Sequence, residues 1–133
     1  MTRFVVDCRV VLRLAEMGYA VPAQHELLAP TLLRSQTLSA LHEAVHAGTL
    51  GEEAALERLE RVGAIRIRLL GDAVLRRNAW RFATELGWAS TYDAEYVALT
   101  KLQADAFVTS DRDLAQAVSG LVETATPDAL RTP

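Results

Sequence analysis

Two short apolar runs, near opposite ends of the chain, each lead into an aspartate. Residues 4–6 read Phe-Val-Val and precede Asp7, and residues 106–108 read Ala-Phe-Val and lead through a hydroxyl pair to Asp111. Runs this short and this apolar predict buried strands. In an open α/β sheet the ligand crevice lies outside the carboxyl ends of the strands. We therefore expect both strand ends to bring their carboxylates to one edge of a sheet.

Strand and helix patterns alternate along the rest of the chain. Residues 27–29 form another apolar run before Pro30, and apolar and arginine residues alternate over 65–69 as in a strand with one polar face. Strands separated by helices imply a mostly parallel sheet between helical layers. We expect one α/β domain over residues 1–133. The expected helices are 10–17, Pro30 to about 47 with the proline in the first turn, 52–62 ended by Gly63, 72–86 ended by Gly87, 93–103 and 112–118.

Composition excludes several classes of protein. Half of the residues are hydrophobic and 23% are charged, which excludes a disordered or fibrous chain. No apolar run approaches the roughly 20 residues of a membrane span, and the first residues lack a signal-peptide pattern. The single cysteine, Cys8, forms no internal disulfide, so we expect a cytoplasmic protein. We expect the Cys8 side chain to be small, buried and not a nucleophile.

Four aspartates are candidate metal ligands: Asp7, Asp93, Asp111 and Asp113. Mg²⁺ and Mn²⁺ prefer oxygen ligands, and clustered carboxylates repel one another until a cation neutralises them. A carboxylate-held ion can position and acidify a water for attack on a phosphodiester. Asp93 and Asp111 each also fit a helix N-cap, so the joint spacing carries the prediction.

Four segments together resemble the PIN-domain family and, in order and interval, its VapC-type toxins. They are Val-Val-Asp at 5–7, Leu-Ala-Pro at 28–30, Thr-Tyr-Asp-Ala-Glu-Tyr-Val-Ala-Leu at 91–99, and Phe-Val-Thr-Ser-Asp-Arg-Asp-Leu at 107–114. The resemblance covers essentially the whole chain. It implies a three-layer α/β/α sandwich and a Mg²⁺-dependent endoribonuclease, often acting on transfer or ribosomal RNA. It also implies a homodimer that a cognate antitoxin holds inactive.

The resemblance assigns roles to individual residues. Asp7, Asp93 and Asp111 match metal-binding acids, Asp113 matches a more variable fourth acid, and Thr109 matches a hydroxyl residue that supports the site. These roles come from the family pattern alone.

Two positions depart from the family pattern. Gln36 stands where the family has a glutamate; its amide oxygen can coordinate, but it brings no charge and takes no proton. Arg9 stands where a small hydroxyl residue is usual. It could pair with Asp7 in the metal's place, contact the scissile phosphate, or remain a solvated arginine. Both departures favour an alternative, a degenerate PIN domain that serves as a binding or regulatory module.

A second motif, His42-Glu43-Ala44-Val45-His46, has the His-Glu-x-x-His spacing of zinc proteases. Glu57 or Glu60 would be the nominal third ligand. The motif comes early, after little sheet, and lacks the extension of the longer form. We therefore expect His42 and His46 to face solvent or the antitoxin.

The remaining aromatic and arginine residues have mainly structural interpretations. Trp80, Phe82 and Trp88 are expected in the core or at the dimer interface. Tyr92 and Tyr96 are expected to pack in the core, with base stacking as the alternative. Arginines between 58 and 81 form either a solvated face or a track for the RNA backbone.

Overall fold

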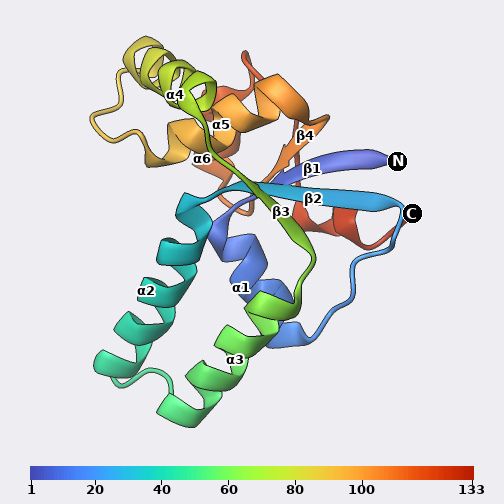
Figure 1. Cartoon of the computed structure of the whole chain (residues 1–133), viewed down its shortest axis with the longest axis vertical. Coiled ribbons are helices and arrows are strands. Elements are labelled where there is room, and N and C mark those ends of the chain that lie inside the picture. Colours follow the sequence, from blue (N-terminus) through green and yellow to red (C-terminus); the bar gives the residue numbers. More distant parts are fainter.

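The computed structural model describes residues 1–133 and has strands and helices in alternation (Figure 1). Five strands form one sheet in the order β3-β2-β1-β4-β5, and every neighbouring pair is parallel. The expected mostly parallel sheet is thereby confirmed. The elements are β1 Thr2–Val6, α1 Cys8–Met17, β2 His25–Pro30, α2 Leu32–His46, α3 Glu52–Ala64, β3 Ile67–Leu70, α4 Ala73–Leu86, α5 Tyr92–Gln103, β4 Ala106–Val108, α6 Arg112–Val118, β5 Thr124–Ala125 and the 3₁₀ helix η1 Pro127–Leu130.

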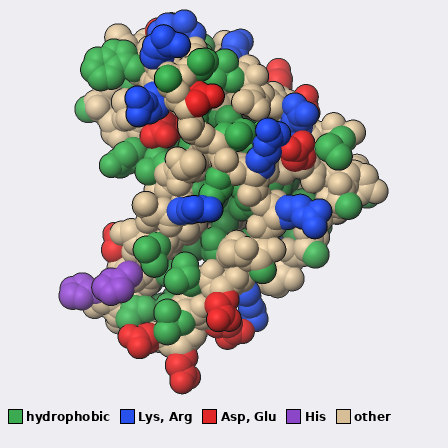
Figure 2. Space-filling view, viewed as in Figure 1, with side chains coloured by type: hydrophobic (Ala, Val, Ile, Leu, Met, Phe, Trp, Pro, Cys, Tyr) green, Lys and Arg blue, Asp and Glu red, His purple; other side chains and the backbone are tan.

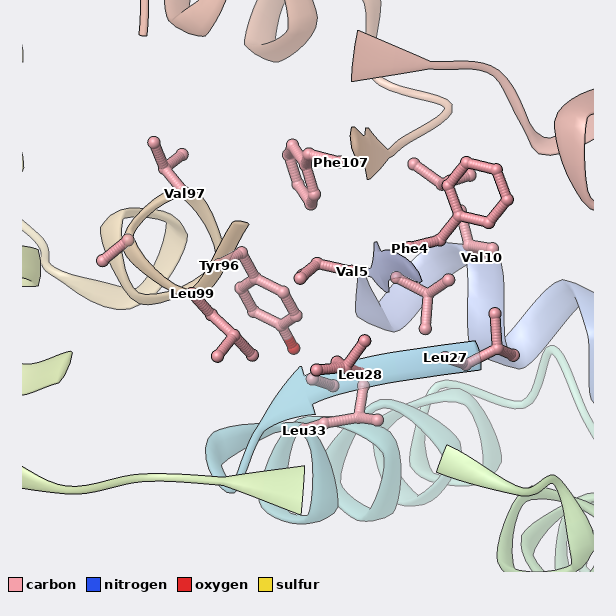
Figure 3. Close-up of a cluster of buried hydrophobic side chains, with 14 of the residues drawn as sticks. Phe4, Val5, Val10, Leu27, Leu28, Leu33, Tyr96, Val97, Leu99 and Phe107 are labelled. Atoms are coloured by element: carbon pink, nitrogen blue, oxygen red, sulfur yellow. The ribbon is translucent and has the colours of Figure 1, made fainter. Parts of the chain in front are cut away.

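Helices cover both faces of the sheet. In Figure 1, α4 and α5 lie on one side of the strands, and α1, α2 and α3 lie on the other. Successive strand side chains point to opposite faces, so both layers need apolar strand residues. The ring of Tyr96 on α5 lies beside Val5 and Leu28, whereas Phe4 lies beside Val10 of α1 (Figure 3). The three-layer arrangement expected from the sequence is confirmed.

The central strands are buried on both faces, as their short apolar runs predict. Val5, Val6, Phe107 and Val108 have no exposed surface. Val6 pairs with Val108, so β1 and β4 end side by side. The residues that follow these two strands therefore meet at the carboxyl edge of the sheet.

Several element boundaries differ from the sequence expectation, and three of them concern Pro30, Gly63 and the third strand. Pro30 is the last residue of β2 and lies outside the next helix, which begins at Leu32. Its missing N–H is tolerated because Pro30 is at the end of the strand, and the next residue, Thr31, donates its N–H to Leu70 of β3. Helix α3 continues through Gly63 to Ala64, since that glycine does not adopt the positive φ that ends α1 at Gly18 and α4 at Gly87. The third strand begins at Ile67, not at residue 65.

No helix is long and apolar enough to cross a membrane.

Candidate metal-ligating site

Asp7 lies at the start of α1, directly after β1, and is 9% exposed. Its Oδ1 accepts a hydrogen bond from the Val10 backbone N–H at 3.0 Å, which makes Asp7 the N-cap of α1. Its Oδ2 accepts a hydrogen bond from the Thr109 hydroxyl at 2.6 Å. Both carboxylate oxygens are thus held in fixed directions, and each keeps a lone pair for a further contact.

Thr109 joins the ends of β1 and β4. It is 4% exposed, and its Oγ1 also accepts a hydrogen bond from the Asp111 backbone N–H at 3.1 Å. One hydroxyl therefore orients the Asp7 carboxylate and the backbone that leads into α6. This geometry suits the supporting role predicted for Thr109.

Asp111 is the N-cap of α6, which confirms the capping role that its sequence position also allowed. Its Oδ1 accepts hydrogen bonds from the backbone N–H groups of Asp113 and Leu114, at 3.0 and 3.1 Å. Its Oδ2 points away from the helix and lies 3.4 Å from Nη1 of Arg9. Asp111 therefore caps a helix with one oxygen and leaves the other to the site. The Asp113 side chain is exposed and makes no hydrogen bond.

Asp93 lies in the first turn of α5 but does not cap that helix. The N-cap is Thr91, so the capping interpretation of Asp93 is wrong. No hydrogen bond or ion pair engages the Asp93 carboxylate. Its pKa is raised above the usual range, first by desolvation and then by the negative charge of Asp111, while Arg9 opposes the shift. A partly desolvated carboxylate without a partner is open to bind a cation.

The electrostatics link the three aspartates. Burial raises the pKa of Asp7; hydrogen bonds from Thr109 and Val10 and the charge of Arg9 lower it, and the charge of Asp93 raises it. The charge of Asp93 thus acts on Asp7, and the charge of Asp111 acts on Asp93, although the three residues come from segments far apart in the sequence. Repulsion between neighbouring carboxylates is relieved when a cation binds.

The candidate ligand atoms are carboxylate oxygens, which are the type of ligand that Mg²⁺ prefers. No group of three or more His, Cys, Asp or Glu side chains converges on one point as the side chains stand. Mg²⁺ needs no such cage, because it is usually bound by one or two carboxylates and keeps several waters. The carboxylate oxygens of Asp7, Asp93 and Asp111 are the candidate ligands here.

Arg9 supplies the positive charge inside the site. Its guanidinium pairs with Asp111, not with Asp7 as one interpretation held, and its field lowers the pKa of both Asp7 and Asp93. Its side chain is 69% exposed, and the 3.4 Å separation is long for a charge-assisted bond. The contact is therefore weak and can open.

Gln36 reaches the site through Tyr96. The Tyr96 hydroxyl donates a hydrogen bond of 2.5 Å to the Gln36 Oε1, which leaves the amide nitrogen without a partner in the chain. Tyr96 is 1% exposed and packs on Phe107, so its predicted core position is confirmed and base stacking by it is wrong. Burial and the charges of Asp7 and Asp93 raise its pKa, so the hydroxyl remains a donor. Sequence reasoning missed this contact, although Tyr96 follows Asp93 by three residues on the same helix face.

Cys8 is half-buried, and burial together with Asp7 raises its pKa to about 11. The thiol is protonated near neutral pH, which agrees with the expected small, unreactive side chain.

The His-Glu-x-x-His segment lies on an outer face of α2. His42 and His46 are exposed, as expected, and histidines protrude from the lower left of the surface in Figure 2. Glu43 accepts a hydrogen bond from Ser39, and Glu57 pairs with Arg61. No third side chain completes the ligand set that a catalytic zinc requires.

A cavity of about 840 Å³ lies away from the acidic site. It is formed by the loop between α1 and β2 with the amino ends of β2 and β3, and none of the four aspartates lines it. Asp7 and Asp111 lie at the opposite, carboxyl edge of the sheet.

Comparison with known proteins shows the fold. No family model and no curated protein sequence matches the chain. Solved structures match along nearly all of it. PAE2754 from Pyrobaculum aerophilum has a TM-score of 0.76 at 24% identity, over 97% of this chain and 92% of that one.

Two VapBC structures are similar as well. VapBC2 from Rickettsia felis, bound to a DNA fragment from their promoter, gives a TM-score of 0.67 at 8% identity, over 93% of this chain and 98% of that one. VapBC-1 from nontypeable Haemophilus influenzae gives 0.60 at 11% identity, over 95% of this chain and 98% of that one. At these identities the likeness is one of fold.

Proposed function

We propose, from the PIN-like fold that this chain shares with VapC-type proteins, that it is a Mg²⁺-dependent endoribonuclease and the toxin of a toxin–antitoxin pair. The observation that supports the proposal is that Asp7 and Asp111 follow the adjacent ends of β1 and β4, and that the charge of Asp93 acts on Asp7 and the charge of Asp111 acts on Asp93. Neighbouring carboxylates repel one another, so they suit a divalent cation better than any neutral ligand.

The chain's own residues divide the work. Asp93 and the open oxygens of Asp7 and Asp111 would hold Mg²⁺, or Mn²⁺ in its place, with Asp113 assisting. When bound, the ion would acidify a water and neutralise charge on the phosphate. Thr109 and the Val10 N–H keep the Asp7 carboxylate in one orientation. This fixed geometry spares reorganisation when the substrate binds.

Gln36 and Arg9 would act on the substrate side. Because Tyr96 occupies the Gln36 amide oxygen, the free amide N–H₂ is the group available to a water or a phosphate oxygen. Arg9, on leaving Asp111, can donate to a phosphate of the RNA. The reaction would be hydrolysis of an RNA phosphodiester, for which the bound ion would supply the activated water.

The fold also suggests partners. The Rickettsia and Haemophilus neighbours are VapBC structures, which supports an antitoxin as the protein partner of this chain. Transfer or ribosomal RNA is the proposed substrate class, a homodimer the proposed assembly, and the cytoplasm the proposed compartment. Sedimentation of the purified chain with and without antitoxin tests the assembly.

A degenerate PIN domain is the second candidate, and the residues at positions 9 and 36 favour it. Gln36 adds no negative charge to the site, and Arg9 already neutralises part of the charge there. Both effects lower the affinity for a divalent ion. Such a chain would keep the fold and its partner surface and act as a binding or regulatory module.

Cleavage of total cellular RNA by the purified, antitoxin-free chain distinguishes the two candidates. Wild type is compared with Asp93→Asn in Mg²⁺, Mn²⁺ or EDTA, and Asp128→Asn serves as the control because Asp128 is exposed on η1, outside the site. Cleavage that needs the ion, disappears in Asp93→Asn and survives in Asp128→Asn supports the nuclease. A folded wild type that is inactive with both ions supports the binding module.

A further inference from the structure

The outer face of α4 carries an exposed tryptophan. Trp80 is 73% exposed, so of its two predicted places the core is wrong and the dimer interface stays a prediction, whereas Phe82 is 5% exposed and Trp88 packs against the core as predicted. The buried residues of α4 lie on the neighbouring and far sides of the helix, and α4 packs on α5. A tryptophan with this much free surface is unusual, because its ring is among the largest apolar groups.

Arginines flank this tryptophan on both sides. At 3.6 residues per turn, Arg76 lies about 40° from Trp80 around the helix axis, Arg77 about 60° on the other side, and Arg81 about 100° on that side. All three are exposed. The indole therefore stands between guanidinium groups on one helix face.

These arginines are free of acidic partners. Arg76 and Arg77 make no side-chain hydrogen bond or ion pair, and Arg81 donates to Asn78 and lies over the Phe82 ring. Figure 2 shows basic side chains over α4 at the top of the molecule, with a few acidic side chains among them, and mostly acidic side chains at the bottom. In a chain of net charge −3, this face is a local positive patch.

We propose that this face of α4 is a subsite for single-stranded RNA, with a base stacked on Trp80 and backbone phosphates held by Arg76 and Arg77. The proposal rests on the proposed ribonuclease function and adds a second contact to it. Stacking accepts any base, and guanidinium groups suit phosphates. The face thus matches the two features that every single-stranded RNA presents.

The subsite lies within reach of the acidic site. Helix α4 packs on α5, whose first turn carries Asp93, and residues 87–91 connect the two helices. Trp80 lies about 9 Å before the end of α4, and packed helix axes are about 8–10 Å apart. One strand of RNA can therefore span both contacts over a few nucleotides. Binding at Trp80 would position the strand and leave the chemistry to the aspartates.

A nucleic acid fits this face better than a second copy of the chain. Two α4 faces brought together would oppose three guanidinium groups to three others, and like charges disfavour such contact. The partner must carry negative charge and a flat surface for the indole. Single-stranded RNA has both.

The native tryptophan can report on the contact. The chain has two tryptophans, so Trp88→Phe leaves Trp80 as the only one. This variant is titrated with a single-stranded 12-nucleotide RNA in EDTA, which prevents metal-dependent cleavage. We expect stacking to quench the Trp80 emission. The Kd should rise roughly sevenfold between 50 and 200 mM salt if two phosphates are held.

Matched variants test the two parts of the subsite by anisotropy of labelled RNA. Trp80→Ala should raise the Kd about tenfold. Arg76→Glu with Arg77→Glu should raise it further, whereas Arg13→Glu with Arg131→Glu, an equal charge change at exposed arginines elsewhere, should have a much smaller effect. Binding of the RNA with unchanged Trp80 emission and an unchanged Kd for Trp80→Ala would overturn the subsite.

Two further outcomes separate the proposals. Mg²⁺-dependent cleavage is measured in parallel, so a chain that cleaves RNA but fails these tests loses the subsite and keeps the nuclease. An emission of Trp80 that shifts to the blue with protein concentration, without RNA, would place a second copy on this face and overturn the proposal. The same shift caused by an acidic peptide, with no response to RNA, would assign the face to a protein partner and overturn it as well.

Discussion

Arg9→Ser removes the positive charge that the chain itself places in the acidic site. The Arg9 guanidinium lies 3.4 Å from Asp111 Oδ2, with the two side chains 69% and 33% exposed. An exposed pair of this kind contributes about 1 kcal/mol or less. A divalent ion that uses the Asp111 oxygen must open the pair, so its loss should tighten ion binding by up to about fivefold.

Titration with Mn²⁺, monitored by isothermal titration calorimetry, measures this change in ion affinity directly. Arg13→Ser is the matched control, because Arg13 is also on α1, is 66% exposed, and pairs with Glu16 outside the site. Without metal, Arg9→Ser should be slightly less stable at neutral pH, since Arg9 lowers the pKa of Asp7 and Asp93. Unchanged or weaker Mn²⁺ binding in Arg9→Ser would refute the reasoning. Tighter binding with slower RNA cleavage would instead show that Arg9 contacts the substrate.

Three further predictions concern the same site. Gln36→Glu keeps the acceptor for the Tyr96 hydroxyl and adds a negative charge, so metal affinity and cleavage should rise while metal-free stability falls; equal cleavage by both proteins would show that a glutamate is dispensable here. Thr109→Val removes the hydrogen bond to Asp7 and should cost about 2 kcal/mol in urea unfolding, with weaker Mn²⁺ binding; a loss below about 0.5 kcal/mol would contradict the role given to this hydroxyl. The folded pKa values of Asp7 and Asp93 are raised, so their contribution to metal-free stability is fully present below the unfolded value near 3.8 and is lost as pH rises through the folded values. Saturating Mg²⁺ should reverse this dependence of stability on pH. In Asp7→Asn, Asp93→Asn and their double variant without metal, the urea midpoint should depend less on pH than in the wild type.

Local sequence patterns predicted most of the elements because they depend on nearby residues. The apolar runs at 4–6 and 106–108 can only be covered strands, and Gly18 and Gly87 end helices through a positive φ that other residues avoid. The predicted element boundaries were wrong where two local sequence signals compete. Pro30 fits either a strand end or a first helical turn, and Gly63 fits either a cap or a helix interior, so only packing selects between them.

The sequence pattern named the aspartates of the candidate site but did not predict the contacts that their neighbours make. Asp7 and Asp111 follow parallel strands, and the topology of such sheets brings their ends together whatever lies between. The sequence pattern does not predict that Tyr96 donates a hydrogen bond to Gln36, 60 positions away. Nor does it predict that Arg9 pairs with Asp111, 102 positions away, and not with the nearer Asp7. Asp7 is already held by Val10 and Thr109, so the exposed oxygen of Asp111 is the one left for the guanidinium.

Burial of single aromatic residues likewise required the tertiary structure. Phe82 and Trp80 are two residues apart on α4, and their large apolar side chains predict the core or the dimer interface for both. Only the packing of α4 on α5 decides that Phe82 points inward and Trp80 outward. By itself, the sequence determined the alternation of strands and helices and the acids at the strand ends, because backbone hydrogen bonding and apolar burial act over short spans. The tertiary structure decided which acids lie near one another and which aromatic ring stays exposed, because those depend on contacts between segments that the chain order leaves far apart.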